Sequence, residues 1–419
     1  MTTLLEAPTT PVSAIGAPRL LSGVVDPGVV GQGRVDHARH LALHGSPVLR
    51  RLSWLVSATH DVSLLGRGGG AFPVSAKLDA MPTGARVAVL LNGSEGEPAS
   101  RKDRTLMTYA PHLVIDGALV VADALDTRDV TIAVHDAVAH DSLVRACSER
   151  TDASDVRVIR TDDGFVGGEI RAVIHRVDGD PAVPDGRRVL PHVRGIGQRP
   201  TFASNVETFA QLALLSRLGV AEFARTGSPN EPGTSLLTLI GDTSRPGVVE
   251  VPNGTPLSSL LPSSSAPVLI GGYHGAWRPS ADGVVVERAS LRAAGSPLGA
   301  GVIARPHPGT CVVDEVVRVA AWLASESAGQ CGPCYFGLPA LADDLAALAA
   351  GAGPERTASA LRRLGLVRGR GACSHPDGSA MFIGTALDTL GPELEVHRRH
   401  GRCGLPPSTV LPLPTVGAR

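Results

Sequence analysis

Three of the chain's six cysteines have the spacing of ligands for a soft metal. Cys331 and Cys334 form a Cys-x-x-Cys pair, and Cys373 follows in a later segment. Such a pair supplies two thiolates from one turn, and a third from another element can close a site around iron or zinc. Position 328, where a further cysteine would complete a four-thiolate pattern, holds alanine. The residues therefore favour an iron–sulfur site with three protein thiolates.

Other interpretations of these cysteines remain open. A redox-active dithiol would be expected in a thioredoxin-like βαβ unit, whereas residues 312–325, just before the pair, carry apolar side chains at helical spacing. A zinc site would need a fourth donor, for which His375 is a candidate. Cys311 and Cys403 are further candidates to complete the site. Cysteines can also be buried without binding any metal.

The elements that must position a ligand begin with a glycine-rich loop. Gly66, Gly68, Gly69 and Gly70 surround Arg67, and Lys77 follows shortly after. Glycines let the backbone approach a ligand closely, although the match to a dinucleotide fingerprint is weak by itself. The loop therefore predicts a ligand site without Rossmann geometry, and a flexible surface loop is the simpler alternative.

Polar residues also follow a predicted buried strand at residues 87–91. Asn92, Glu95 and Glu97 lie directly after it, at the end where α/β sheets usually bind ligands. A second glycine turn ends at Gly168 and Glu169. Residues 204–207, Ser-Asn-Val-Glu, read as a capping box before an apolar helix. That helix start is either a simple cap or a phosphate site.

Composition limits the classes of protein that fit. The chain has 419 residues, 43% of them hydrophobic, and a net charge of -1, so we expect several folded domains and no nucleic-acid partner. The first 21 residues do not resemble a signal peptide, and no apolar run approaches the ~20 residues of a membrane helix. Scattered cysteines without such a signal indicate a cytoplasmic protein with reduced thiols.

Alternation of strands and helices predicts an α/β fold with a mostly parallel sheet. We expect a loosely packed N-terminal arm at residues 1–50 and an α/β domain at 51–230. Short strands predict a β-grasp-like module at 231–300, and Ala/Leu-rich helices predict a bundle around the cysteines at 301–405. Residues 406–419 would form a C-terminal tail.

Several motifs, in this order, resemble those of one family over roughly residues 60–400. They are Gly66-Arg67-Gly68-Gly69, Lys77, Asn92-x-x-Glu95-x-Glu97-Pro98, Lys102-Asp103-Arg104, Asn205-Val206-Glu207-Thr208 and Glu326-Ser327-x-Gly329-x-Cys331-x-Pro333-Cys334. The family is that of the flavin-carrying, NADH-oxidising subunit of respiratory complex I, which also serves NAD-linked hydrogenases and formate dehydrogenases. The resemblance implies an FMN-binding α/β domain, a β-grasp-like (SLBB-type) module and a helical bundle with an iron–sulfur motif.

The resemblance also implies roles for individual residues. Glu97 would be catalytic and face the nicotinamide of NAD(H). Iron of a 4Fe–4S or 3Fe–4S cluster would be held by Cys331, Cys334 and Cys373, with the fourth ligand missing at Ala328. The residues that would bind FMN are Gly66, Arg67, Gly68, Gly69, Lys77, Asn92, Glu95, Gly168, Glu169, Ser204 and Asn205.

Departures from the family pattern fall on the nicotinamide side. Ile170 replaces an acid, and Ser94 replaces another. Three aromatic positions hold Leu78, Ala80 and Leu190, and a basic clamp residue aligns with Arg187. We therefore expect weaker binding of NADH than of FMN.

The resemblance implies an NAD(P)H-dependent electron-transfer subunit that passes electrons from FMN to the cluster and on to a partner. That partner would be a ferredoxin-like or other iron–sulfur protein, or a membrane redox protein. An adaptor that no longer oxidises NADH and a non-catalytic scaffold are the alternatives. The near-intact flavin motifs favour an electron-transfer role over the scaffold.

Overall fold

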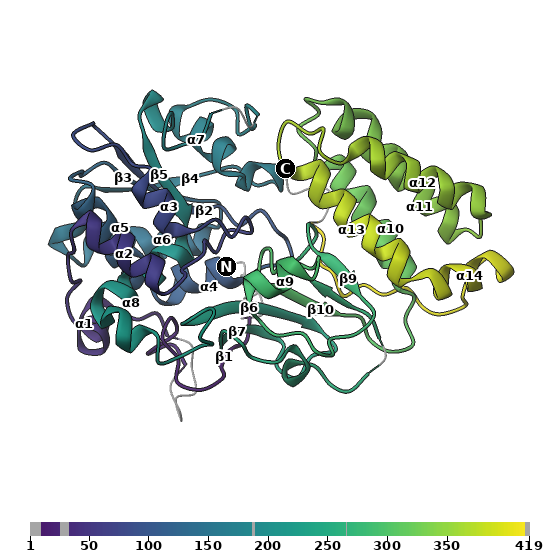
Figure 1. Ribbon diagram of the computed structural model, residues 1–419, viewed down its shortest axis with the longest axis horizontal. Helices are drawn as coiled ribbons and strands as arrows, with labels where there is room; N and C mark the ends of the chain where they lie inside the picture. Colours follow the sequence, from purple (N-terminus) through teal and green to yellow (C-terminus); the bar gives the residue numbers. More distant parts are fainter. Residues whose placement is uncertain (1–9, 26–32, 187–188, 265, 415–419) are drawn as a thin grey trace, which may run out of the picture.

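The computed structural model describes residues 10–25, 33–186, 189–264 and 266–414, which form three bodies (Figure 1). The first is built on a four-stranded parallel sheet in the order β4-β3-β2-β5. The apolar runs predicted as strands form the middle of this sheet because both of its faces are covered by helices. Its strands are β2 (Ala88–Gly93), β3 (Val130–Val134), β4 (Val156–Arg160) and β5 (Thr201–Asn205).

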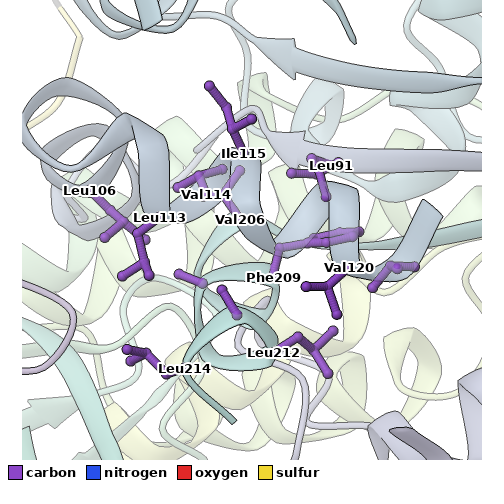
Figure 2. Packing of buried hydrophobic residues seen from close by; sticks show 14 of the residues in the cluster. Leu91, Leu106, Leu113, Val114, Ile115, Val120, Val206, Phe209, Leu212 and Leu214 are labelled. Atoms are coloured by element: carbon purple, nitrogen blue, oxygen red, sulfur yellow. The ribbon is translucent and has the colours of Figure 1, made fainter. Parts of the chain in front are cut away.

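Helices pack on both faces of this sheet, and α5 and α8 make the main apolar contact (Figure 2). Gly117 lets these two helices approach, since a Cβ there would lie 2.0 Å from the carbonyl oxygen of Phe209. The helices of this body are α1 (His37–His44), α2 (Leu52–Asp61), α3 (Val74–Asp79), α4 (Lys102–Tyr109), α5 (Pro111–Ala124), α6 (Ala137–Ser148), α7 (Ile170–Asp178) and α8 (Val206–Phe223), with 3-10 turns η1 (Thr151–Ala153), η2 (Val166–Gly168) and η3 (Ile196–Gln198).

The strand order places a topological switch point between β2 and β5. From β2 the chain proceeds to β3 and β4 on one side, whereas β5 joins the other side. Crossover connections leave in opposite directions at such a point, so a crevice opens at the carboxyl ends of the two strands. The polar segments that follow β2 and end β5 meet there.

The second body is a six-stranded mixed sheet in the order β1-β7-β6-β10-β8-β9. β10 lies beyond residue 300 but pairs with both β6 and β8, so this sheet extends to residue 305. Its elements are β1 (Val12–Ala14), β6 (Thr234–Gly241), β7 (Gly247–Pro252), β8 (Val268–Ile270), β9 (Ala276–Arg278) and β10 (Val302–Arg305), with η4 (Leu257–Leu260) and α9 (Arg288–Ala293).

Part of the segment expected to be a loosely packed arm is firmly packed. β1 pairs in parallel with β7, and Leu20 and Leu21 are fully buried. The carboxylate of Glu250 accepts hydrogen bonds from three successive backbone N–H groups, those of residues 19–21. Local composition did not reveal this packing because the partner lies more than two hundred residues away in the chain. The domain boundaries themselves stay a prediction.

The third body is the helical bundle (Figure 1). It consists of α10 (Val312–Ser325), the π-helical turn η5 (Pro333–Gly337), α11 (Leu338–Ala349), α12 (Pro354–Val367), α13 (His375–Thr389) and α14 (Gly391–His400). Among the helices that the structure describes, none alone is long and apolar enough to cross a membrane; α4 and α5 reach the required composition only as a pair bent by 94°.

Candidate functional site

A cavity of about 670 Å³ lies at the switch point, within the ~300–1,000 Å³ typical of cofactor sites. All three bodies contribute to its wall: the α/β domain supplies most of it, the mixed sheet supplies His274, and the bundle supplies Cys373. Every residue predicted to bind FMN or to act in catalysis lines this cavity, namely Gly66, Arg67, Gly68, Gly69, Lys77, Asn92, Glu95, Glu97, Gly168, Glu169, Ser204 and Asn205. The structure thus brings together residues from four separate motifs.

Arg67 in the glycine loop is partly committed to the scaffold. Its Nη1 atom lies 2.9 Å from Glu231 Oε1, and the guanidinium of Arg288 contacts the same carboxylate oxygen at 2.7 Å. Two arginines on one carboxylate leave a net positive charge beside the cavity. Nε and Nη2 of Arg67 are buried without a partner, so the guanidinium acts on the cavity through its charge rather than through exposed donors.

Lys77 on α3 is the second cation of the cavity. Its ammonium donates to the carbonyl oxygen of Ala203 at 3.1 Å. Burial lowers the pKa of Lys77 to about 8, because a buried ammonium loses hydration. An anionic group in the cavity would restore the charged form.

The polar residues at the end of β2 and just after it, Asn92 and Glu95, make different structural contacts. Glu95 accepts the backbone N–H groups of Asp103 and Arg104 at 3.1 and 3.2 Å, so its carboxylate caps the start of α4. Asn92 donates to the carbonyl oxygen of Gly168 at 2.9 Å and thereby joins β2 to the second glycine turn. Both residues position the wall of the cavity as well as lining it.

Glu97 is a buried acid with a raised pKa. Burial raises its pKa to about 8, although its carboxylate accepts the backbone N–H of Tyr273 at 2.8 Å. Near neutral pH this group is therefore mostly a carboxylic acid, which can donate a hydrogen bond and hold a proton. The contact with Tyr273 also ties the α/β domain to the mixed sheet.

Glu169 caps α7 rather than projecting freely, since its Oε2 accepts the backbone N–H of Arg171 at 2.9 Å. Gly168 has to be small, because a Cβ there would lie 2.7 Å from the carbonyl oxygen of Ser94. Ile170, the next residue, faces the same cavity. Its apolar side chain offers no hydrogen bond to a ligand.

The predicted capping box is wrong by one residue. Asn205, not Ser204, is the N-cap of α8, and its Oδ1 accepts the backbone N–H of Glu207 at 2.9 Å. Ser204 still belongs to β5, where it pairs with Leu91 of β2. Glu207 does not return to the cap but lies 3.0 Å from Lys102 Nζ.

Sequence reasoning named Lys102 and Asp103 as family motif residues but missed them as part of the cavity wall. Lys102 is almost fully buried, and its ammonium lies 2.6 Å from Asp103 Oδ1. The other carboxylate oxygen of Asp103 accepts from the Asn205 amide at 2.6 Å. This buried network joins α4 to the N-terminus of α8 and fixes the switch-point crevice.

Aromatic residues also line the cavity where sequence reasoning did not expect them. Phe165 packs edge-on against His274 of the mixed sheet and Trp322 of the bundle, with ring centroids 4.5 and 5.3 Å apart. We call these three residues the aromatic junction. Phe72 lies on the glycine-loop side of the cavity.

The positions at which aromatics were expected do not line this cavity. Leu78 is fully buried in the core and cannot stack on a ligand, while Ala80 and Leu190 also lie outside the lining. Ser94 is in the wall, where it shares a 2.6 Å hydrogen bond with Thr161. Arg187 lies outside the described residues.

The predicted cysteine centre lies beside the cavity, which Cys373 lines, and its assembly around one cluster stays a prediction. Cys331 lies just before η5 and Cys334 is its second residue, and Cys334 N–H donates to Cys331 O at 3.1 Å. Burial raises the pKa of the Cys334 thiol to about 12, and the thiols of Cys331 and Cys373 raise it further. The three cysteines are therefore neighbours, and Cys373 also faces the cavity.

None of the three candidates for a fourth ligand is free to complete this centre in the structure as described. Both ring nitrogens of His375 are engaged, Nε2 with Leu323 O at 2.9 Å and Nδ1 with His274 at 3.1 Å. Cys311 and Cys403 lie at the opposite end of α10, whose 14 residues span roughly 21 Å. The proposed rescue by these residues is therefore wrong, and three thiolates remain.

The cavity and the cysteine centre together define a flavin and iron–sulfur electron-transfer protein. Residues 59–214 match the family model of the Nuo51 FMN-binding domain. Residues 314–397 match the family model of the NADH-ubiquinone oxidoreductase-F iron-sulfur binding region. The ammonium of Lys77, the nearby charge of Arg67 and the closely approaching glycine backbone suit an anionic cofactor. FMN and an iron–sulfur cluster are thus the cofactors of this chain.

Similar proteins agree with this class. An NADH-quinone oxidoreductase subunit of Rhizobium meliloti (strain 1021) is 30% identical over 377 residues, covering 83% of this chain and 90% of the relative. The corresponding NADH-quinone oxidoreductase subunit of Salmonella typhimurium is 29% identical over 373 residues, covering 81% and 83%. The chain belongs to this family of NADH-quinone oxidoreductase subunits.

The fold is shared more widely. A solved NAD+-reducing NiFe-hydrogenase in the air-oxidized state superimposes with a TM-score of 0.80 at 23% identity, covering 93% of this chain and 68% of that chain. This likeness supports the α/β architecture with its C-terminal helical region. The predicted family and fold class are both confirmed.

Proposed function

We propose that this chain accepts electrons from NAD(P)H at an FMN bound in the cavity and delivers them through the Cys331, Cys334 and Cys373 centre to an iron–sulfur partner. The observation that carries the proposal is that Cys373 lines the same cavity as the glycine loop and the acids after β2. An FMN held by these residues would supply the change from two-electron to one-electron transfer, and a cluster held by the cysteines would supply a one-electron acceptor.

The residues of the cavity divide this work. Arg67 and Lys77 supply positive charge for the anionic parts of the cofactor, and the glycines let the backbone come close. Glu97 holds a proton next to the cavity. Through Asp103 and Glu207, Lys102 fixes the two helix starts that border the crevice, so the wall keeps its shape.

The surface beside the cysteine centre suits a partner protein. Tyr335 and Phe336 directly follow Cys334 and are 64% and 71% exposed. Exposed aromatics are typical of interfaces, and an electron acceptor has to dock close to the cluster. We assign this surface to a ferredoxin-like or other iron–sulfur protein of the cytoplasm, with a membrane redox protein as the next carrier.

One observation favours a second function. Ile170 lines the cavity with an apolar side chain, at a position where the family resemblance implies an acid, so the chain would also suit an adaptor that receives electrons from a protein donor.

The visible spectrum of the anaerobically purified, FMN- and iron-reconstituted chain separates these functions. Bleaching by stoichiometric NADH or NADPH supports the proposal. Bleaching by dithionite alone supports the adaptor. Failure to bind flavin or iron after reconstitution would reject both and leave the scaffold.

A further inference from the structure

A second group of metal-ligand side chains lies in the bundle, away from the cysteine centre. The Sγ atoms of Cys311 and Cys403, a carboxylate oxygen of Glu393 and a ring nitrogen of His397 all lie within 4.8 Å of one another. Cys311 and His397 are buried, and the other two are half-buried. The set offers two thiolates, one imidazole and one carboxylate.

The imidazole is oriented as a ligand would be. His397 Nδ1 lies 2.6 Å from the carbonyl oxygen of Ala349, which can only accept a hydrogen bond. The proton of the neutral ring is therefore on Nδ1, and the lone pair of Nε2 points towards Cys311 Sγ at 3.4 Å. A hydrogen bond of this kind on the far nitrogen is the usual support for a metal-bound histidine.

The chain is folded to bring these four residues together. Glu393 and His397 stand one turn apart on α14, so both project from one face. Gly401, with φ 78°, ends the helix and turns the chain so that Cys403 returns to the bundle. The segment after it pairs with Cys311, whose N–H donates to Pro406 O at 2.7 Å and whose carbonyl accepts from Ser408 N at 3.0 Å.

Ordinary packing explains only part of this arrangement. Glu393 Oε1 accepts the backbone N–H groups of Val312 and Val313 at 2.9 and 3.4 Å and so caps α10. Capping does not account for two thiols and an imidazole at the same place. In a tetrahedral zinc site the sulfur–nitrogen edge is about 3.5 Å, close to the 3.4 Å between Cys311 and His397.

We propose that Cys311, Glu393, His397 and Cys403 bind one Zn²⁺ ion in a closed, four-coordinate structural site. Two thiolates with one imidazole and one carboxylate suit zinc, and the absence of an open position in the set points to structure rather than catalysis. The ion would clamp α14 and the C-terminal segment to the start of α10. It lies roughly 21 Å along α10 from the cluster end, so it is a separate centre.

The test uses the full-length chain with C331S, C334S and C373S together, which removes the other thiolate centre. The metal-free, reduced protein is titrated with Zn²⁺ against a chromogenic chelator, and Co²⁺ serves as the spectroscopic probe. We expect one equivalent of tight zinc and the visible bands of tetrahedral thiolate-bound Co²⁺. C403S should raise the zinc dissociation constant at least about a hundredfold, since even second-shell changes cost 10–100-fold.

Matched variants distinguish an effect on folding from an effect on metal ligation. E393Q retains an oxygen that can cap α10 but removes the negative charge. It should therefore lower the affinity for zinc while the circular dichroism spectrum stays unchanged. C403H should keep one zinc and shift the Co²⁺ bands, because a nitrogen replaces a sulfur. C147S, at a half-buried cysteine on α6, should change nothing.

Three results would overturn the site: no stoichiometric zinc in the triple variant, zinc affinity unaffected by C403S, or a Cys311–Cys403 disulfide in oxidised protein that never binds metal.

Discussion

Lys77 and Glu97 border the same cavity, and burial moves the pKa of each to about 8, one downward and one upward. Removal from water disfavours the charged form of both groups. Near neutral pH the cavity therefore presents a charged ammonium and a neutral carboxylic acid. Such a pair suits an anionic cofactor that gains protons as it is reduced.

The charge on Lys77 should set the pH dependence of FMN affinity. Below about pH 8 the ammonium is charged and attracts the anionic cofactor; above it, binding must first restore the proton, so affinity should fall up to about tenfold per pH unit. Flavin fluorescence titrations across this range measure the effect. Lys77→Arg should flatten the pH profile of FMN affinity because a guanidinium stays charged. If Lys77→Ala keeps the same slope, a group other than Lys77 causes the pH dependence.

Glu97 should make the apoprotein less stable as pH rises. Its pKa is about 4.5 in the unfolded chain and about 8 in the folded one, so the folded state binds the extra proton between these values. Stability is then lost as pH rises through that window, by roughly 3–5 kcal/mol in all. Glu97→Gln should flatten part of the fall in thermal midpoint between about pH 5 and 8. A parallel curve for the variant would argue against the raised pKa.

Ile170 should limit nicotinamide binding. Replacing it with glutamate adds a hydrogen-bonding group in the cavity, worth about 1–3 kcal/mol, which corresponds to about 5- to 150-fold in the dissociation constant of NADH. Stopped-flow reduction of bound flavin at varied NADH measures it. Ile170→Gln is the uncharged control, and no gain with either variant would mean that this position does not contact the nucleotide.

At the scale of elements, local spacing located most of the site. The glycine loop, the strand-end acids and the Cys-x-x-Cys pair were predictable because each works through a few neighbouring residues. The N-cap of α8 was missed by one residue because β5 pairs with β2 as far as Asn205, which leaves Ser204 in the strand. Both residue types cap helices well, so only the strand pairing decides between them.

Other features depend on contacts that no local pattern contains. Leu78 faces the core because the six-residue helix α3 is oriented by tertiary packing. The buried partners of the Arg67 guanidinium are Glu231 and Ser235, far away in the sequence. The second ligand cluster likewise joins the start of α10 to the chain after α14.

The loop between α10 and η5 decides how complete the cluster is. Ala328 is half-buried in this loop and supplies no ligand. Ala328→Cys should raise the iron content from three towards four per chain and lengthen the half-life of the cluster in air. Iron analysis and electron paramagnetic resonance measure both. Ala328→Ser, whose side chain is similar in size but offers an oxygen in place of sulfur, should not raise the iron content as Ala328→Cys does. Equal iron content in the wild type and in Ala328→Cys would show that the loop does not reach the cluster.

At the scale of the whole molecule, residues of all three bodies wall one cavity; Figure 1 shows how the bodies are arranged. Several contacts join these bodies around the cavity, among them the ion pair of Arg67 with Glu231. Glu97 with Tyr273 joins the α/β domain to the mixed sheet, and Phe165 with His274 and Trp322 joins all three bodies. The relative placement of flavin and cluster thus depends on interfaces rather than on any single domain.

Because the wall is shared, a bound flavin would be enclosed, and its residence time would depend on how often the bodies separate. Phe165→Ala opens the aromatic junction without removing a charged group, so it should accelerate FMN release much more than it slows FMN uptake. Exchange with a flavin analogue measures the release rate, and Phe223→Leu, in the core at the end of α8 away from the cavity, is the control. Equal release rates would mean that the cofactor escapes through the glycine loop alone.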